Sequence, residues 1–197
     1  MEQVIKDTIR FFNGTPVLKL PPLIKFHGTG VYAIYYTGGS DVYKLLSQKN
    51  KVEFSAPIYV GKAVPRGWRQ ARIETDSGKK SYELHRRLQE HARSIRYAKN
   101  LLEEDFRCRF IILEDTASSL IGTVEAALIR YHKPIWNTEI DGFGNHDPGK
   151  GRYNQAKSEW DVIHPGRPWA DKCLGAAPNG NEVEEKIAAY FTKWNNR

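Results

Sequence analysis

The sequence is poor in cysteine: its 197 residues include two, Cys108 and Cys173, which lie 65 positions apart. Neither has another cysteine or a histidine at zinc-ligand spacing, so free thiols are expected rather than a disulfide framework or a zinc knuckle. Long apolar runs are also missing. Stretches such as Phe110–Leu113 are far too short to cross a bilayer, and residues 1–10 lack the apolar segment of a secretory signal. We therefore expect a cytoplasmic protein without a membrane partner.

What the chain does contain is the composition of a folded, basic protein. Hydrophobic residues make up 40% and charged residues 27%, and the length is enough for one buried core, so we expect a single domain. The formal charge of +7 favours an anionic partner, most commonly nucleic acid. Between Lys62 and Arg109, thirteen Lys and Arg stand against seven acids. Such clustering favours a phosphate-binding surface, although a solvated helix face would have a similar composition.

Hydrophobic patterns predict an α+β fold. Three segments, 31–36, 58–60 and 108–113, are rich in the aromatic and β-branched residues of strands. Apolar residues recur at helical spacing in 84–95 and 120–131, and 183–194 is expected to form a further helix. Ser81 is a candidate cap for the first helix, and Ser118 or Ser119 for the second. We expect a small central antiparallel or mixed sheet of about three strands, flanked by helices, with inserted and C-terminal loop elements.

Two regions do not fit these regular patterns. Residues 41–56 are too long for a tight hairpin loop and too polar for a core strand, so they are interpreted as an insertion between the first two strands. Residues 141–168 are dense in Gly, Asn, Asp and Pro. The aromatic residues Phe143, Tyr153, Trp160 and Trp169 supply anchors that a flexible linker would not need, so this stretch is expected to be an ordered loop region.

Five side chains could carry chemistry, but each has an ordinary structural reading. Arg87 and His91 lie one turn apart beside an apolar helix stripe, where a histidine is more often a core residue. Glu125 lies partly on an apolar helix face, as a metal ligand or as the partner of an arginine. Tyr32 and Tyr59 lie on expected neighbouring strands, where tyrosine usually serves packing. Spacing alone leaves these alternatives open.

A resemblance adds to this reading. Gly30-Val31-Tyr32, Tyr59-Val60-Gly61, the Arg87-x-x-x-His91 pair, Glu125 in a helix and Asn137 after it resemble, in order, the signature of the GIY-YIG nucleases. The two tyrosines are 27 residues apart, whereas the common family form has about a dozen between them. That spacing, the 144–152 loop and the segment 158–167 are similar to the stand-alone GIY-YIG restriction endonucleases that cut the palindrome CCGCGG.

The resemblance implies roles for individual residues. The implied catalytic set is Tyr32, Tyr59, Arg87, His91, Glu125 and Asn137. Glu125 would bind one divalent cation, expected to be Mg²⁺ with Mn²⁺ as a substitute, and no organic cofactor is needed. Arg87 would hold the scissile phosphate. Tyr32, Tyr59 or His91 would accept the proton, with Lys62 as electrostatic support, and Asn137 would hold a phosphate or fix the site geometry.

Double-stranded DNA is the expected partner. The candidate DNA-binding residues are Lys62, Arg66, Arg69, Arg152, Lys157 and Arg167, and Lys44 and Lys49 of the insertion are further candidates for reading guanine. A palindrome cut on each strand by one site calls for a homodimer. The domain would comprise a core at about 28–140, the insertion at about 37–57 and a DNA-contacting extension at about 141–197. The alternatives are a structure-specific repair nuclease and a DNA-binding module without catalysis.

Overall fold

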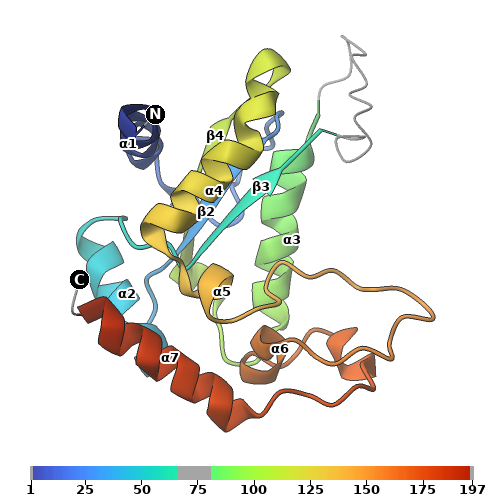
Figure 1. Ribbon diagram of the computed structural model, residues 1–197. Helices are drawn as coiled ribbons and strands as arrows, with labels where there is room; N and C mark the ends of the chain where they lie inside the picture. The colour runs from blue at the N-terminus through green and yellow to red at the C-terminus, as the bar shows by residue number, and fades with distance from the viewer. Residues whose placement is uncertain (1, 66–80, 196–197) are drawn as a thin grey trace.

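The computed structural model describes residues 2–65 and 81–195 and has the predicted α+β architecture (Figure 1). Its sheet consists of β1 (Leu18–Lys19), β2 (Gly30–Tyr36), β3 (Tyr59–Ala63) and β4 (Phe106–Ile112). The strands are ordered β1-β4-β2-β3, and each neighbouring pair is antiparallel. The short strand β1 adds a fourth member to the three strands that the composition predicts. It is only two residues long, too short to leave a strand pattern in the sequence.

Helices flank the sheet and form a second group below it (Figure 1). Their bounds are α1 Glu2–Asn13, α2 Lys44–Val52, α3 Glu83–Tyr97, α4 Ile121–His132, α5 Ile135–Thr138, α6 Glu159–Ile163 and α7 Gly180–Asn195. Short 3₁₀ turns occur at Asp41–Tyr43, Glu103–Asp105, Asp115–Leu120 and Ala170–Lys172. Among the described residues, no helix is both long enough and apolar enough to span a membrane.

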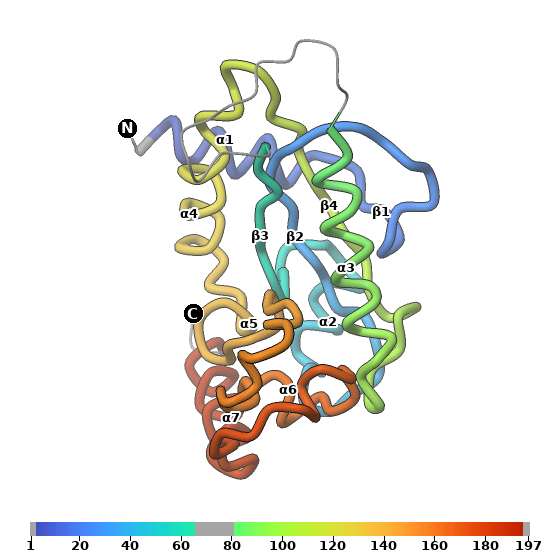
Figure 2. The backbone as a smooth tube through the Cα atoms, turned by 90° about the vertical axis from the view of Figure 1, so that its right-hand side faces the viewer, coloured from blue at the N-terminus to red at the C-terminus, as the bar shows by residue number. Residues whose placement is uncertain are grey.

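The central strand β2 supplies residues to cores on both faces of the sheet. Tyr32, Ile34 and Tyr36 belong to the core cluster that contains the apolar residues of α3, whereas Val31 and Ala33 belong to the cluster that contains those of α1 and α4. This alternation follows from the two-residue period of a strand. In Figure 2, α3 crosses in front of the strands, which follow one another as β3, β2, β4 and β1. The edge strand β3 therefore lies between α3 and α4.

The segment interpreted as an insertion is helical and packs into the core. Tyr43 and Leu46 are buried there. Asn50 is buried too, and its Nδ2 donates to the carbonyl oxygens of Tyr36 and Ala56, at 3.0 and 2.9 Å, while its Oδ1 accepts from Ala56 N. Asn50 thereby satisfies the backbone at both ends of the segment. The region is therefore an ordered helical segment whose two ends are joined by the hydrogen bonds of Asn50.

The predicted N-terminal caps of α3 and α4 have different outcomes in the structure. Helix α3 begins at Glu83, and Ser81 Oγ accepts a hydrogen bond of 3.4 Å from Glu83 N, although Tyr82 occupies the capping position. The predicted cap of α4 is wrong: Ser118 Oγ donates to the Asp115 carbonyl inside a 3₁₀ turn, and α4 begins only at Ile121. Serine hydroxyls also bond to a backbone carbonyl three residues earlier, so the sequence could not separate these two uses.

A buried polar chain joins the C-terminal segment to the rest of the fold. Trp136 Nε1 donates to the Tyr43 hydroxyl at 3.0 Å, and that hydroxyl lies 2.8 Å from His164 Nε2. His164 Nδ1 lies 2.9 Å from Asn100 Oδ1, which can only accept. His164 is therefore the Nδ1-protonated tautomer, and Tyr43 donates to its Nε2. Burial lowers the pKa of His164 to about 3, so this network holds a neutral imidazole.

Candidate active site

The two glycine–tyrosine segments lie side by side in β2 and β3. Tyr32 is the direct register partner of Gly61. A Cβ atom at Gly61 would lie 2.4 Å from the Tyr32 hydroxyl oxygen, and one at Gly30 would lie 2.0 Å from the Ile111 carbonyl oxygen. Real Cβ atoms do not make contacts this short. Glycine is therefore needed at both positions, in one case so that the Tyr32 ring can lie across the neighbouring strand.

Tyr32 pairs with a histidine on α3. Its hydroxyl oxygen lies 2.6 Å from His91 Nε2, and both side chains are buried. The centroid of the Tyr59 ring lies 5.1 Å from that of His91 and 6.3 Å from that of Tyr32. On His91, Phe143 stacks at 4.6 Å. The structure thus brings three of the predicted residues into one aromatic cluster, with Phe143 from the C-terminal loop as a fourth member.

Arg87 lies one turn before His91 on α3, and its side chain is 19% exposed. Its Nη1 atom donates to Glu90 Oε2 at 3.1 Å and also contacts the imidazole of His146. Its Nη2 atom donates to the Gly144 carbonyl oxygen at 2.9 Å. The guanidinium thus lies between its own helix and the loop that follows Phe143.

Burial dominates the proton affinities of this cluster. It raises the pKa of Tyr32 well above the usual value, with a further contribution from Tyr59, and it raises the pKa of Tyr59. It lowers the pKa of His91 well below the usual value, and the charge of Arg87 acts in the same direction. At neutral pH, Tyr32 is therefore a neutral phenol that donates to a neutral His91.

Glu125 approaches from α4, which packs on β3 across from α3 (Figure 1). Its Oε2 atom accepts a hydrogen bond of 2.6 Å from Lys62 Nζ, and its side chain is 18% exposed. The charge of Glu125 contributes to the raised pKa values of Tyr32 and Tyr59, which places the carboxylate within electrostatic reach of both hydroxyls. Lys62 pairs with this carboxylate and not with Tyr59, the partner suggested by its place in the sequence.

Asn137 fixes the strand that carries Tyr59. Its Oδ1 accepts from Val60 N and its Nδ2 donates to Val60 O, each at 2.8 Å. These contacts satisfy the outward-facing backbone of β3 between Tyr59 and Gly61. These contacts are those expected of a residue that fixes the site geometry, and the roles of Asn137 in holding a phosphate or capping the turn after Pro134 stay predictions.

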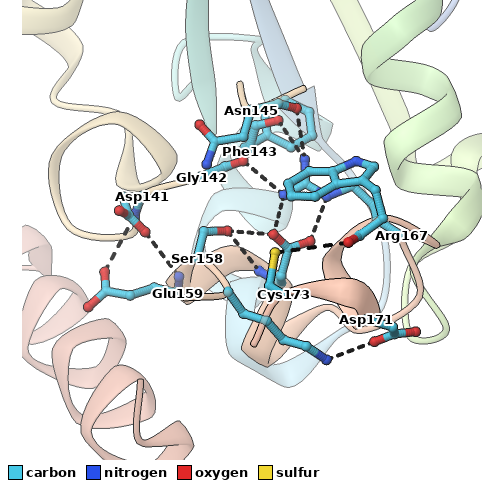
Figure 3. Close-up of polar contacts among 12 residues, drawn as sticks. Asp141, Gly142, Phe143, Asn145, Ser158, Glu159, Arg167, Asp171 and Cys173 are labelled. Atoms are coloured by element: carbon cyan, nitrogen blue, oxygen red, sulfur yellow. Dashed lines mark hydrogen bonds and ion pairs between the residues drawn. The ribbon is translucent and has the colours of Figure 1, made fainter. Parts of the chain in front are cut away.

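The loop that reaches Arg87 is held by a buried ion pair (Figure 3). Arg167 Nε and Nη2 donate to the two carboxylate oxygens of Asp161, at 2.6 and 2.7 Å, and both side chains are 1% exposed. The guanidinium also donates to the carbonyl oxygens of Gly142, Phe143 and Asn145, at 2.9 to 3.3 Å. This burial contradicts the predicted DNA contact of Arg167, which supports the loop from inside.

The other candidate DNA-binding residues differ in whether their side chains are exposed or already contact other residues. Arg152 is exposed on the same loop region. Lys157 Nζ forms an ion pair with Asp171 at 2.7 Å, and Lys49 lies over the Trp194 ring at 5.3 Å. Lys44 is exposed at the start of α2. Arg66 and Arg69 lie outside the described residues, so their contact with DNA stays a prediction.

A comparison with protein families identifies this arrangement. A family model described as the Eco29kI GIY-YIG domain matches residues 24–191. The chain belongs to this family. It is a DNA endonuclease of the restriction type within the GIY-YIG superfamily, which confirms the resemblance read from Tyr32, Tyr59, Arg87, His91 and Glu125. No curated protein matches the chain at a significant level.

GIY-YIG nucleases generally use a divalent metal ion, and Glu125 fits such an ion. It offers a hard, partly exposed carboxylate oxygen, the ligand type that Mg²⁺ and Mn²⁺ prefer. In the free protein this carboxylate is paired with the Lys62 ammonium group. Within residues 2–65 and 81–195, no three His, Cys, Asp or Glu side chains gather as a ready metal cage. The remaining ligands would be water and substrate oxygens.

Proposed function

We propose that the protein is a cytoplasmic type II restriction endonuclease that hydrolyses phosphodiester bonds of double-stranded DNA in the presence of Mg²⁺ at the palindrome CCGCGG. The observation that carries this proposal is the meeting of Arg87, the Tyr32–His91 pair and Glu125 around one edge strand. A cation for the phosphate, a route for a proton and a carboxylate for a metal are the parts that phosphodiester hydrolysis requires.

Arg87 binds the scissile phosphate. Its planar group of donors can contact two phosphoryl oxygens at once and neutralises the charge that builds up in the transition state. Burial acts to lower the pKa of Arg87, but its interactions with Tyr32, Glu90 and Tyr59 outweigh burial and raise the pKa. The guanidinium therefore stays charged in a partly buried position, where its field is screened less than at the surface.

Tyr32 and His91 act together as the proton acceptor. A free tyrosinate is disfavoured because burial raises the pKa of Tyr32. In a relay, the Tyr32 oxygen takes a proton from the attacking water while its own proton passes to His91 Nε2, 2.6 Å away. His91 is available for this step because burial keeps it neutral. Tyr59, which is less buried, orients the water or the phosphate beside them.

Glu125 would hold the divalent cation, which would supply positive charge to neutralise the scissile phosphate. Lys62 balances the carboxylate charge in the free protein, because its ammonium group lies 2.6 Å from Oε2. Asn137 holds the Tyr59 segment of β3 in register with this site.

Recognition of the palindrome uses surfaces outside the catalytic cluster. Arginine and lysine read guanine in the major groove, and exposed candidates are Arg152 on the C-terminal loop and Lys44 on α2. Two copies of the chain, related by twofold symmetry, would place one active site on each strand of the palindrome.

Digestion of a plasmid that contains one CCGCGG site, beside a matched plasmid in which the site is mutated, tests this function. We expect Mg²⁺-dependent cutting at one position in the first plasmid only, with the ends located by run-off sequencing. Cutting of branched or damaged DNA alone would instead identify a structure-specific nuclease. Absence of any cutting, with binding retained, would identify a DNA-binding module.

The metal assignment has its own test. Glu125→Ala should abolish cleavage in Mg²⁺ and still bind the site in Ca²⁺, because the change removes the metal ligand and leaves the DNA-binding surface intact. Asn154→Ala, at an exposed position of the C-terminal loop, serves as the matched control. A Glu125→Ala enzyme that cuts at the normal rate would refute the role of this carboxylate.

A further inference from the structure

A second histidine lies against the candidate phosphate-binding arginine. His146 comes from the C-terminal loop, and its Nε2 atom is in close contact with Arg87 Nη1, while its Nδ1 atom lies 3.4 Å from the same nitrogen. Its side chain is 61% exposed, so it borders the solvent side of the guanidinium. Neither the family signature nor the spacing of the catalytic residues indicates His146.

The loop is fixed on the N-terminal side of His146. Gly142 has a φ of +99°, and the carbonyl oxygens of Gly142, Phe143 and Asn145 accept from the buried Arg167. Phe143 stacks on the catalytic His91. A Cβ atom at Gly144 would lie 2.8 Å from the Tyr59 hydroxyl oxygen, so this part of the loop lies directly against the cluster.

The loop is also fixed on the C-terminal side. Asp147 Oδ1 accepts from Gly149 N at 2.8 Å and from the Tyr153 hydroxyl at 2.9 Å. These bonds close a turn immediately after His146. The loop backbone that carries the imidazole towards Arg87 is therefore braced on both sides of His146.

The contact with Arg87 fixes the state of His146. A guanidinium has no acceptor, so the imidazole nitrogen that faces it must accept, which requires a neutral ring with the proton on the other nitrogen. That nitrogen, Nδ1, lies 3.8 Å from Glu90 Oε2, and Glu90 also accepts from Arg87. The Arg87 guanidinium is thus contacted by both Glu90 and His146.

We propose that His146 is a positioning residue for DNA cleavage: with the Gly144 carbonyl, its neutral imidazole holds the Arg87 guanidinium in the orientation that the scissile phosphate requires. The inference rests on the proposed role of Arg87 and extends it to a residue outside the signature. The open side of the imidazole faces the solvent from which a DNA backbone would approach. His146 acts on the phosphate through Arg87.

Protonation of His146 would reverse the contact. Burial and the charge of Arg87 lower the pKa of His146, while Glu90 raises it and the more distant Arg86 and Arg167 lower it further. The net shift is downward, so the imidazole is neutral at pH 7 and becomes charged only below its usual range. An imidazolium would repel Arg87, so cleavage should decline on the acid side as His146 titrates.

Single-turnover cleavage by His146→Ala, His146→Gln and the control Asn154→Ala tests the proposal. We expect His146→Ala to cut about 10- to 100-fold more slowly with less than a threefold change in DNA affinity, because Arg87 remains but is less well held. His146→Gln should recover most of the rate, since its amide oxygen accepts from Arg87 at every pH, and it should flatten the acid limb. The control should match the wild type.

Two outcomes would overturn the proposal: a His146→Ala rate within twofold of the wild type, or a Gln variant as slow as the Ala variant with an unchanged acid limb. An NMR titration of His146 in the wild type and in Arg87→Gln separates this inference from the proposed function. Removal of Arg87 should raise the pKa of His146, whether or not the enzyme cuts the chosen DNA. An unchanged pKa would show that the two groups are not in contact.

Discussion

Two regions of this protein use the same three side-chain types for opposite purposes. At the candidate active site, Tyr32 pairs with His91, and Arg87 lies beside them. Where the C-terminal segment joins the core, Tyr43 pairs with His164, and Arg167 braces the adjoining loop. The tyrosine–histidine distances are 2.6 and 2.8 Å, and all four of these side chains are buried. Residue type and burial alone therefore do not distinguish the regions.

The regions differ in how completely the protein itself supplies acceptors for the guanidinium of Arg167 and for that of Arg87. Arg167 is matched by a full carboxylate, by three carbonyl oxygens and by the Trp160 and Trp169 rings, each 4.6 Å from its guanidinium carbon. Arg87 keeps 19% of its side chain exposed, and one of the groups that contact it, the imidazole of His146, is itself exposed. A saturated arginine stabilises the fold, whereas an incompletely satisfied one is available to a substrate.

The same substitution at both arginines should give the largest contrast. Arg87→Lys loses the planar pair of donors, so the cleavage rate should fall by about 10³-fold while the protein stays folded. Arg167→Lys should lower the free energy of unfolding by about 3–5 kcal/mol, because Asp161 is left buried with an incomplete partner. Cleavage assays and urea unfolding of both variants would measure this. Equal losses of stability would remove the distinction between the two regions.

The tyrosines offer a second matched pair. Tyr32→Phe removes the proposed proton acceptor and should slow cleavage by about 10²-fold or more. Tyr43→Phe leaves Trp136 Nε1 and His164 Nε2 without their partner, so it should cost about 1–3 kcal/mol of stability and leave the rate at low temperature within twofold. If Tyr43→Phe slowed cleavage as much as Tyr32→Phe, the assignment of the two pairs would be wrong.

Lowering the pH should reduce the free energy of unfolding through the buried histidine of each region. Burial lowers the pKa of His91 and lowers that of His164 to about 3, so the folded protein keeps both rings neutral while the unfolded chain binds protons below about pH 6.5. Above about pH 6.5 both states carry neutral rings, so these histidines do not lower the free energy of unfolding. Below that pH the free energy of unfolding falls by about 1.4 kcal/mol per pH unit for each ring. Urea unfolding between pH 7 and 5 would measure the slope, and His164→Gln should reduce it.

The smallest effect is expected at the exposed arginine of the loop region. Arg152→Ala should weaken binding to CCGCGG about five- to tenfold at 0.1 M salt, with a smaller effect on unrelated DNA and none on stability, because Arg152 is an exposed candidate for reading guanine. Lys193→Ala, at an exposed position on α7, is the matched control. An equal loss for CCGCGG and for unrelated DNA, with a smaller salt dependence, would instead indicate a phosphate contact of Arg152.

Much of the catalytic region was predictable because short-range patterns encode it. The strands of Tyr32 and Tyr59 follow from composition, and the shared face of Arg87 and His91 follows from a four-residue spacing. The order of these motifs with Glu125 then indicates the family, as the family match confirms. Each of these signals lies within one helix or strand, or repeats a known order of them.

The loop region was less predictable because its contacts join distant parts of the chain. The aromatic anchors Phe143 and Trp160 indicate an ordered loop, and both are buried. That Arg167 faces inward could not be inferred, since its partner Asp161 and the carbonyls near residue 143 meet only after folding. For the same reason, the glycine- and asparagine-rich run around His146 indicates a turn but not a contact with Arg87.

The residues that brace the active-site loop lie late in the sequence, and this bears on the order in which the site can form during synthesis. Segments carrying Tyr32 and Arg87 leave the ribosome before Asp161 and Arg167, which brace the loop against the active site. A domain generally folds as a unit, and a chain that ends before Arg167 lacks the side chain that holds the carbonyl oxygens of Gly142, Phe143 and Asn145. We therefore expect a nascent chain to gain its DNA-cutting activity only after Arg167 has been synthesised.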